Sequence, residues 1–228
     1  MTSPEIRIAG DSALLVEFGS EISAAHSRRV ADLVGRLAEG PPDPDLVHVQ
    51  PAYSSVLVRF DARRTDHASV SARLLALLAK EGGLARAPVR TREIPVCYGG
   101  EFGPDLDSVA AAAGFSPEDA VAAHAGASYS VCFLGFMPGF AYLSGLPASL
   151  VSPRLSVPRR VVPAGSVGIA GAQTGVYPVS SPGGWRLIGR TPLAMFDPAR
   201  EPMSHLALGD LVRFKPVTPE EFEALCPR

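Results

Sequence analysis

Residues 162–192 read VPAGSVGIAGAQTGVYPVSSPGGWRLIGRTP, and this stretch decides the fold of the C-terminal part of the chain. Short apolar runs alternate in it with glycine and proline every few residues. The wider span of residues 133–192 holds 10 glycines and 8 prolines. Turn-forming residues at this density, between short apolar runs, are typical of a β-barrel or sandwich with tight corners and not of a helical domain.

The segments on either side of this stretch complete a second domain. A strand is predicted at residues 93–98, followed by two short helices. The second of these starts at Ser116-Pro117-Glu118-Asp119, because serine caps a helix, proline fits the first turn and acids face its positive end. A strand at residues 211–214 and a short helix from Thr218 follow the turn-rich stretch. We therefore expect a mainly-β domain over residues 88–228, with short helices at its start and end.

The first 87 residues show a different pattern. Residues 6–18 read as a hairpin around Gly10-Asp11. Amphipathic helices are predicted at residues 23–38 and 66–81, the second ended by Gly82-Gly83, and strands at residues 46–49 and 56–60. This order is of the split β-α-β type, so we expect a small α+β domain over residues 1–87, with a connector near residues 84–92.

Composition excludes several classes of protein. The chain has 228 residues, 46% of them hydrophobic, and a net charge of −2, which disfavours disorder and a basic nucleic-acid binder. It has no apolar run near the ~20 residues of a spanning helix and no visible signal peptide, so we expect no membrane partner and a cytoplasmic location. The three cysteines are far apart, and they indicate neither a disulfide framework nor a metal site.

The charge pattern is uneven. Residues 120–196 contain no aspartate or glutamate but five arginines, namely Arg154, Arg159, Arg160, Arg186 and Arg190. A guanidinium binds a carboxylate or phosphate through two parallel hydrogen bonds, so this region suits an anion. The alternative is that the arginines face solvent, or pair with acids elsewhere in the fold or on a partner. The segment itself supplies no carboxylate pair for acid–base chemistry and no hard oxygen ligands for a metal, although Asp105, Asp107 or Asp197 could fold back onto it.

Individual residues leave further alternatives open. His124, near the end of a predicted helix, is a candidate base or ligand, or else a cap or packing residue. Gln173 and Tyr177 could orient a small polar ligand or pack a corner. Trp185 is a candidate anchor for the core or for an interface. The glycines of residues 165–171 favour a strand with close backbone contacts over a phosphate loop, and no P-loop or G-x-S-x-G motif is present.

Several motifs resemble one known family. They are Gly135-Phe136-Met137-Pro138-Gly139-Phe140-Ala141-Tyr142-Leu143, Pro153-Arg154-Leu155, Pro158-Arg159, the glycine-rich run quoted above, and Ile188-Gly189-Arg190-Thr191-Pro192. On these residues the chain resembles the KipI family, also called allophanate hydrolase subunit 1 or the B subunit of the bacterial 5-oxoprolinase. The resemblance covers nearly the whole chain.

The resemblance implies a fold and an activity. The fold is an α+β N-terminal domain followed by a mainly-β, cyclophilin-like barrel. The activity is ATP-dependent opening of 5-oxo-L-proline to L-glutamate in a heteromeric complex. The implied partners are a C subunit of the KipA-like, allophanate hydrolase subunit 2 type and a lactam-utilisation type A subunit. ATP, with or without Mg²⁺, would be a co-substrate of the complex, and no bound cofactor is expected on this chain alone.

Two other functions stay open for this family. One is inhibition of a sensor histidine kinase, and the other is a role in an allophanate- or urea-related amide enzyme. Under the enzyme hypothesis the expected anion-binding residues are Arg154, Arg159, Arg160, Gln173 and Arg190. His124 and Tyr177 are the candidate catalytic residues, placed with Gln173 at the barrel mouth. Phe136 and Trp185 are the expected partner interface.

Overall fold

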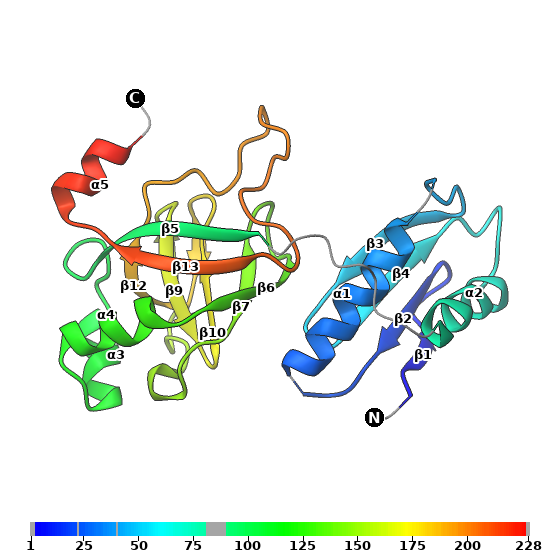
Figure 1. Ribbon diagram of the computed structural model, residues 1–228, viewed down its shortest axis with the longest axis horizontal. Helices are drawn as coiled ribbons and strands as arrows, with labels where there is room; N and C mark the ends of the chain where they lie inside the picture. The colour runs from blue at the N-terminus through cyan, green and yellow to red at the C-terminus, as the bar shows by residue number, and fades with distance from the viewer. Residues whose placement is uncertain (1–2, 22, 40, 81–89, 227–228) are drawn as a thin grey trace. The chain divides into compact units, whose positions relative to one another are not determined.

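A computed structural model describes residues 3–21, 23–39, 41–80 and 90–226. The chain divides into two compact units, Met1–Pro88 and Val89–Arg228. Figure 1 shows a sheet with helices packed on it in the first unit and a barrel with short helices in the second. The predicted connector and the Gly82-Gly83 end of the second helix fall wholly or largely outside the described residues.

The first unit is built on a four-stranded antiparallel sheet with the order β1-β2-β4-β3. Its strands are β1 (Glu5–Ile8), β2 (Ala13–Glu17), β3 (Leu46–Pro51) and β4 (Ser55–Phe60). The hairpin turns at Gly10, whose φ of 80° suits glycine. Strands β2 and β3 each pair antiparallel with β4, so they run parallel with β4 between them. This is the split β-α-β arrangement that the sequence predicts.

Two helices cover one face of this sheet. Helix α1 (Ala24–Ala38) is capped by Ser23, and α2 (His67–Ala79) is capped by Asp66. Alternate residues of β2 and β4 are buried and meet the buried faces of both helices. The buried core of the unit includes Leu14, Val16, Val56, Val58, Val30, Leu33, Val70 and Leu74.

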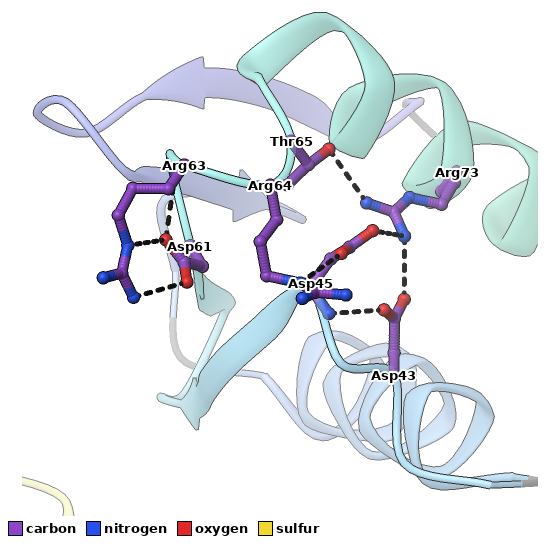
Figure 2. Close-up of polar contacts among 7 residues, drawn as sticks. All are labelled: Asp43, Asp45, Asp61, Arg63, Arg64, Thr65 and Arg73. Carbon is purple, nitrogen blue, oxygen red and sulfur yellow. Dashed lines mark hydrogen bonds and ion pairs between the residues drawn. The ribbon is translucent and has the colours of Figure 1, made fainter.

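A polar clamp, formed by Arg73 with Asp43, Asp45 and Thr65, ties α2 to the segment before β3 (Figure 2). Arg73 Nη1 donates to Asp43 at 2.9 Å and to Asp45 at 3.2 Å, and its Nη2 donates to Thr65 at 3.2 Å. Arg64 adds a 3.1 Å bond from Nε to Asp45. Each carboxylate in the clamp therefore has a cationic partner.

The second unit is a closed mixed barrel with the strand order β10-β7-β6-β13-β5-β12-β9. Its strands are β5 (Thr91–Tyr98), β6 (Tyr129–Leu134), β7 (Ala141–Ser144), β9 (Ser166–Ala170), β10 (Gln173–Val176), β12 (Arg186–Arg190) and β13 (Leu211–Pro216). Strands β5 and β13 run parallel and lie side by side in Figure 1, whereas the other neighbours are antiparallel. The expected closed barrel is confirmed, and it fits the cyclophilin-like type.

The remaining elements of the second unit surround the barrel. They are α3 (Leu106–Ala113), α4 (Pro117–Gly126), the short 3-10 helix η1 (Ala148–Leu150), α5 (Pro219–Leu225), and a separate two-stranded ribbon of β8 (Arg159–Val162) and β11 (Ser181–Gly183). Ser116 caps α4 as predicted, and Gly114 ends α3 with a φ of 71°. Thr218 and Glu221 form a capping box at the start of α5.

Side chains alternate across the barrel wall because successive strand residues point to opposite faces. Leu143, Val167, Ile169 and Val176 belong to the core inside the barrel. Their neighbours Tyr142, Gly175, Gly168 and Leu187 form a row across β7, β10, β9 and β12 on the outer face. The barrel unit therefore has two cores, one inside the wall and one outside it.

Candidate functional site

Two glycines make room for aromatic rings on the outer face of the barrel. Gly168 and Gly175 are paired across β9 and β10. A Cβ at Gly168 would lie 3.1 Å from the Trp185 Cβ, and one at Gly175 would lie 3.2 Å from the Phe140 ring. Aromatic side chains thus pack directly on the strand backbone, which confirms the close backbone contacts predicted for the glycine-rich run.

The outer aromatic cluster consists of Phe140, Tyr142, Tyr177 and Trp185. Phe140 is central, with its ring centroid 5.4 Å from Trp185, 5.3 Å from Tyr177 and 4.9 Å from Tyr142, all edge to face. Val162 of β8 packs on the same cluster, so the β8–β11 ribbon covers it. Edge-to-face packing adds about 1 kcal/mol per pair beyond burial, which makes this a rigid platform.

The two tyrosines of the cluster are held as neutral phenols. Burial raises the pKa of Tyr177 and of Tyr142, and the positive charge of Arg154 opposes that rise for both. A Cβ at Gly183 would lie 2.5 Å from the Tyr177 hydroxyl oxygen, so glycine is required where β11 crosses Tyr177. Arg154 is exposed, and its positive charge acts on both phenols, which remain protonated at neutral pH.

Arg159 is committed to an ion pair. Its Nη2 donates to Asp105 Oδ1 at 2.8 Å, and the other carboxylate oxygen of Asp105 accepts from the Leu187 backbone N–H at 2.7 Å. Asp105 is only 8% exposed, so this pair is largely shielded from water. Pairing with an acid from outside the acid-free segment is therefore the outcome for Arg159, which attaches β8 to the start of α3.

The other four arginines of the acid-free segment divide into two kinds. Arg190 donates from Nε to the Ala164 carbonyl at 3.0 Å, and Arg186 donates to the Pro153 carbonyl at 3.2 Å. Arg154 and Arg160 are exposed and make no hydrogen bond or ion pair with any residue that the structure describes. We call these two the uncommitted arginines, because their guanidinium groups have no partner among the described residues.

His124 lies in the core on the interior side of the barrel wall. It is fully buried and stacks on Phe214 at 4.7 Å. The Thr174 hydroxyl donates to the Gly168 carbonyl, so its oxygen accepts from His124 Nε2 at 3.2 Å. Nδ1 then accepts from the Tyr98 hydroxyl at 2.8 Å. Burial lowers the pKa of His124 to about 3, so the ring is neutral with both nitrogens engaged.

The structure does not bring the two predicted catalytic residues together. Tyr177 lies in the outer cluster and His124 in the inner core, with the barrel wall between them. The separation follows from the alternation of side chains along β10 and the residues after it. Thr174 points to the inner side, where it contacts His124, and Tyr177, three residues later, points to the outer side. Gln173 begins β10 and is half-buried, next to Thr174. The expected grouping of these three residues at one barrel mouth is therefore not what the structure shows.

The two predicted interface residues also differ in placement. Trp185 is 5% exposed and belongs to the aromatic cluster, so it is a buried residue that packs beneath the exposed ones and does not itself form a surface. Phe136 is 65% exposed and has a φ of 68°, a left-handed conformation that is unusual for a bulky residue. Its ring meets Phe140 edge to face at 5.6 Å. Phe140 itself was not predicted as a site residue, although its position between Phe136 and Tyr142 was a signal.

Metal-binding groups, membrane-spanning helices and hollows are further features that bear on function in the rest of the described structure. The described residues contain no group of three or more His, Cys, Asp and Glu side chains placed to hold a metal ion. No helix within those same residues is long and apolar enough to cross a membrane. A hollow of about 320 Å³ in the first unit is lined mainly by Leu37, Leu46, Val70, Leu74 and Leu77, and its rim includes Arg73 and Asp43 of the polar clamp.

Comparisons with known proteins agree with this architecture. Residues 4–206 match the family described as "Carboxyltransferase domain, subdomain C and D". The chain is 40% identical to the B subunit of 5-oxoprolinase from Bacillus subtilis over 96% of this chain and 95% of that protein. It is 42% identical to the B subunit of 5-oxoprolinase from Escherichia coli O157:H7 over 92% of this chain and 94% of that protein.

Solved structures resemble the chain as well. A conserved uncharacterized protein from Pyrococcus horikoshii, PH0987, is 48% identical, with a TM-score of 0.58 over 96% of this chain and 100% of that chain. The protein TTHA0988 is 38% identical, with a TM-score of 0.80 over 93% of this chain but 40% of that chain. The Kluyveromyces lactis urea amidolyase, at 23% identity and a TM-score of 0.78 over 97% of this chain and 15% of that chain, shares the fold. From the family match and the near full-length identities, this chain belongs to the family of 5-oxoprolinase B subunits, which has the fold of carboxyltransferase subdomains C and D.

Proposed function

We propose that this chain is a subunit of an ATP-dependent 5-oxoprolinase that converts 5-oxo-L-proline to L-glutamate. The observation that carries the proposal is the 40% identity to the B subunit of the Bacillus subtilis 5-oxoprolinase over 95% of that protein. A relationship of this extent includes both units of the chain, so it supports a shared activity as well as a shared fold.

The proposed enzyme is active only as a complex. Relatives that cover nearly the whole chain are each named as one component of a multi-subunit enzyme. TTHA0988 carries further sequence, since the chain covers 40% of it. The specific partners follow from the family resemblance, which implies a C subunit of the allophanate hydrolase subunit 2 type as the direct partner and a lactam-utilisation type A subunit as the third member.

The chemistry of the outer site supports an anionic substrate. 5-Oxo-L-proline carries a carboxylate, and ATP, which drives the opening of its amide, carries phosphate groups. Both reactants are therefore anions. Arg154 is exposed and uncommitted among the described residues, and it lies near the neutral phenols of Tyr142 and Tyr177. An exposed guanidinium can bind a carboxylate or a phosphate through charge and two parallel hydrogen bonds.

Roles within the proposal follow the observed placements. Arg154 binds the substrate carboxylate or a phosphate, and Tyr177, buried beneath the β8–β11 ribbon, is a positioning residue that holds the aromatic cluster in place. Arg159 positions the β8–β11 ribbon through Asp105. His124 maintains the inner core beneath β10 and is a positioning residue, because both of its ring nitrogens are engaged away from solvent. ATP, with Mg²⁺, would bind at a site that residues of the other subunits complete.

The test is ATP turnover dependent on 5-oxo-L-proline, measured with the three subunits together and with each omitted in turn. We expect turnover only with all three present. Arg154→Ala should lower kcat/KM for 5-oxo-L-proline at least tenfold, whereas Arg213→Ala, an exposed arginine on β13 across the barrel, should leave it unchanged. A stable three-subunit complex with no turnover would contradict the proposed substrate.

A further inference from the structure

An exposed apolar surface lies around the outer aromatic cluster. We call it the partner face and define it by Phe136, Val157, Arg160, Val161 and Val179. Phe136 is 65% exposed, Val157 77%, Val161 65% and Val179 43%. Exposed apolar residues grouped in this way mark interaction surfaces more often than they do when scattered singly.

Three chain segments bring these residues to one side of the barrel. The ring of Phe136 rests on Phe140 of the cluster. Val161 precedes Val162, which is buried in the cluster. Pro178, next to Val179, approaches Gly139, where a Cβ would lie 3.3 Å from its side chain. The first two segments contact the aromatic cluster and the third directly follows Tyr177 of that cluster, so the surface has a rigid base and loses little entropy when a partner binds.

Phe136 has its left-handed φ at the centre of a tight turn, which the Met137 N–H closes by donating to the Gly135 carbonyl at 2.8 Å. A left-handed φ at a bulky residue costs about 1 kcal/mol or more, and such strain persists where function requires it. Most of the ring is nevertheless left in water. An aromatic side chain that is both strained and exposed is the kind of residue that anchors an interface, where aromatic residues carry much of the binding energy.

The charge of the region defines the occupant. Residues 120–196 contain no acid, and Arg160 is exposed without an ion pair among the described residues. Asp105 reaches the region from outside that segment, but it is buried and paired with Arg159. If a second copy of this chain docked face to face, residues 120–196 of that copy would offer no carboxylate to Arg160, which disfavours a symmetric homodimer. Charge complementarity instead requires a surface with carboxylates around an apolar centre.

We propose that the partner face binds the C subunit of the complex, through an apolar patch that acidic side chains surround on that protein. This inference rests on the proposed function for the identity of the partner. Phe136 and Val161 would supply the apolar centre of the interface, and Arg160 would supply its charge-assisted contact.

The test measures the affinity of the purified chain for the purified C subunit by titration calorimetry, at low and high salt. Phe136→Gly and Arg160→Glu should each weaken binding at least tenfold, as expected of interface anchors. Arg213→Glu, the matched charge reversal on β13, should stay within twofold of the unchanged chain. Affinity should fall as salt rises for the unchanged chain, and less so for Arg160→Glu.

Phe136→Gly gives a readout that separates binding from folding. Glycine relieves the left-handed strain, so the melting temperature of the isolated chain should stay the same or rise while affinity for the C subunit falls. Loss of both stability and affinity would assign Phe136 to the fold and overturn its role as an anchor. The variant does not alter Tyr142 and Tyr177, so the aromatic cluster beneath Phe136 keeps its residues.

Other outcomes decide between the two proposals. Binding that ignores Phe136→Gly and Arg160→Glu, in a complex that turns over 5-oxo-L-proline, overturns the partner face and leaves the function standing. Binding that follows the expected pattern without turnover supports the face and overturns the function. Failure of the unchanged chain to bind the C subunit overturns the partner face, as does a homodimer abolished by Phe136→Gly.

Discussion

The polar clamp of the first unit and the outer wall of the barrel use arginine in different ways. In the clamp, Arg73 contacts Asp43 and Asp45 at once, and Arg64 shares Asp45 (Figure 2). On the barrel, Arg154 and Arg160 are exposed without such partners among the described residues. The same guanidinium therefore joins two segments where carboxylates are near and is available to outside anions where they are absent.

A second contrast lies across the barrel wall. The inner core is a packed set of aliphatic and aromatic residues in which a polar group such as His124 is fully satisfied. The outer cluster is aromatic, rests on two glycines and borders exposed residues. The inner core stabilises the fold, whereas the outer cluster also supports a surface. Substitutions on the two sides of each contrast should therefore differ in their effects.

The largest effect is expected from removing the support of the outer cluster. Trp185→Ala deletes a buried indole and should lower the free energy of unfolding by about 3–5 kcal/mol. Phe136→Ala, one contact further out, should change it by about 0.5 kcal/mol or less, because the ring is mostly in water. Calorimetric unfolding of the barrel unit measures both. A small cost for Trp185→Ala would show that the cluster is not a second core.

A smaller loss in the free energy of unfolding is expected when Asp105, whose carboxylate pairs with Arg159 of the acid-free segment, is replaced. Asp105→Ala leaves the Leu187 N–H and the Arg159 guanidinium without their acceptor, and should cost about 2–3 kcal/mol. Asp105→Asn keeps one acceptor oxygen and should cost about half as much. Urea denaturation compares the two. Equal losses would mean that the space filled by the side chain matters more than the ion pair.

The inner core should make stability depend on pH through His124. Its pKa is about 3 in the folded chain, against about 6.5 when unfolded. The unfolded chain therefore takes up a proton that the folded chain refuses, and stability falls as pH drops from 6.5 toward 3. The loss should reach about 1.4 kcal/mol per pH unit.

The variant that tests this effect is His124→Gln, with unfolding followed between pH 7 and pH 5. It should be less stable at pH 7 but lose less stability on acidification. Burial also lowers the pKa of His205, so His205→Gln is the matched control. An unchanged slope in His124→Gln, with a flatter slope in His205→Gln, would assign the acid sensitivity to the other histidine.

The smallest effects compare the two kinds of arginine directly. Arg73→Ala should destabilise the first unit by about 1 kcal/mol, since it leaves Asp43 without its partner in a partly buried clamp. Arg154→Ala should leave the stability of the barrel unit unchanged, because no described residue pairs with it. Thermal unfolding at low and high salt measures both, and a destabilised Arg154→Ala would reveal a structural role for that side chain.

Much of the fold follows from local sequence. Ser116 caps its helix as predicted, and Ser23, Asp66 and Thr218 cap helices that were predicted to begin at those residues, because a hydroxyl or carboxylate needs only the next turn of backbone. The hairpin at Gly10 and the glycine-rich strand β9 also formed as predicted. The acid-free segment bears two exposed arginines, Arg154 and Arg160, that pair with no described residue, and their role in binding an anion stays a prediction.

Features set by neighbours along the chain can be predicted from the sequence: helix starts, turns, the split β-α-β order, and the absence of acid from residues 120–196. Only the tertiary structure decided which groups meet. Asp105 reaches Arg159 from 54 residues away, and His124 reaches Thr174 from 50 residues away. Whether Tyr177 and His124 share a pocket depends on strand register and on which strands close the barrel. A strand's side chains alternate with a period of two, so pairing across the sheet, and not spacing along the chain, assigns each residue to the inner or outer face.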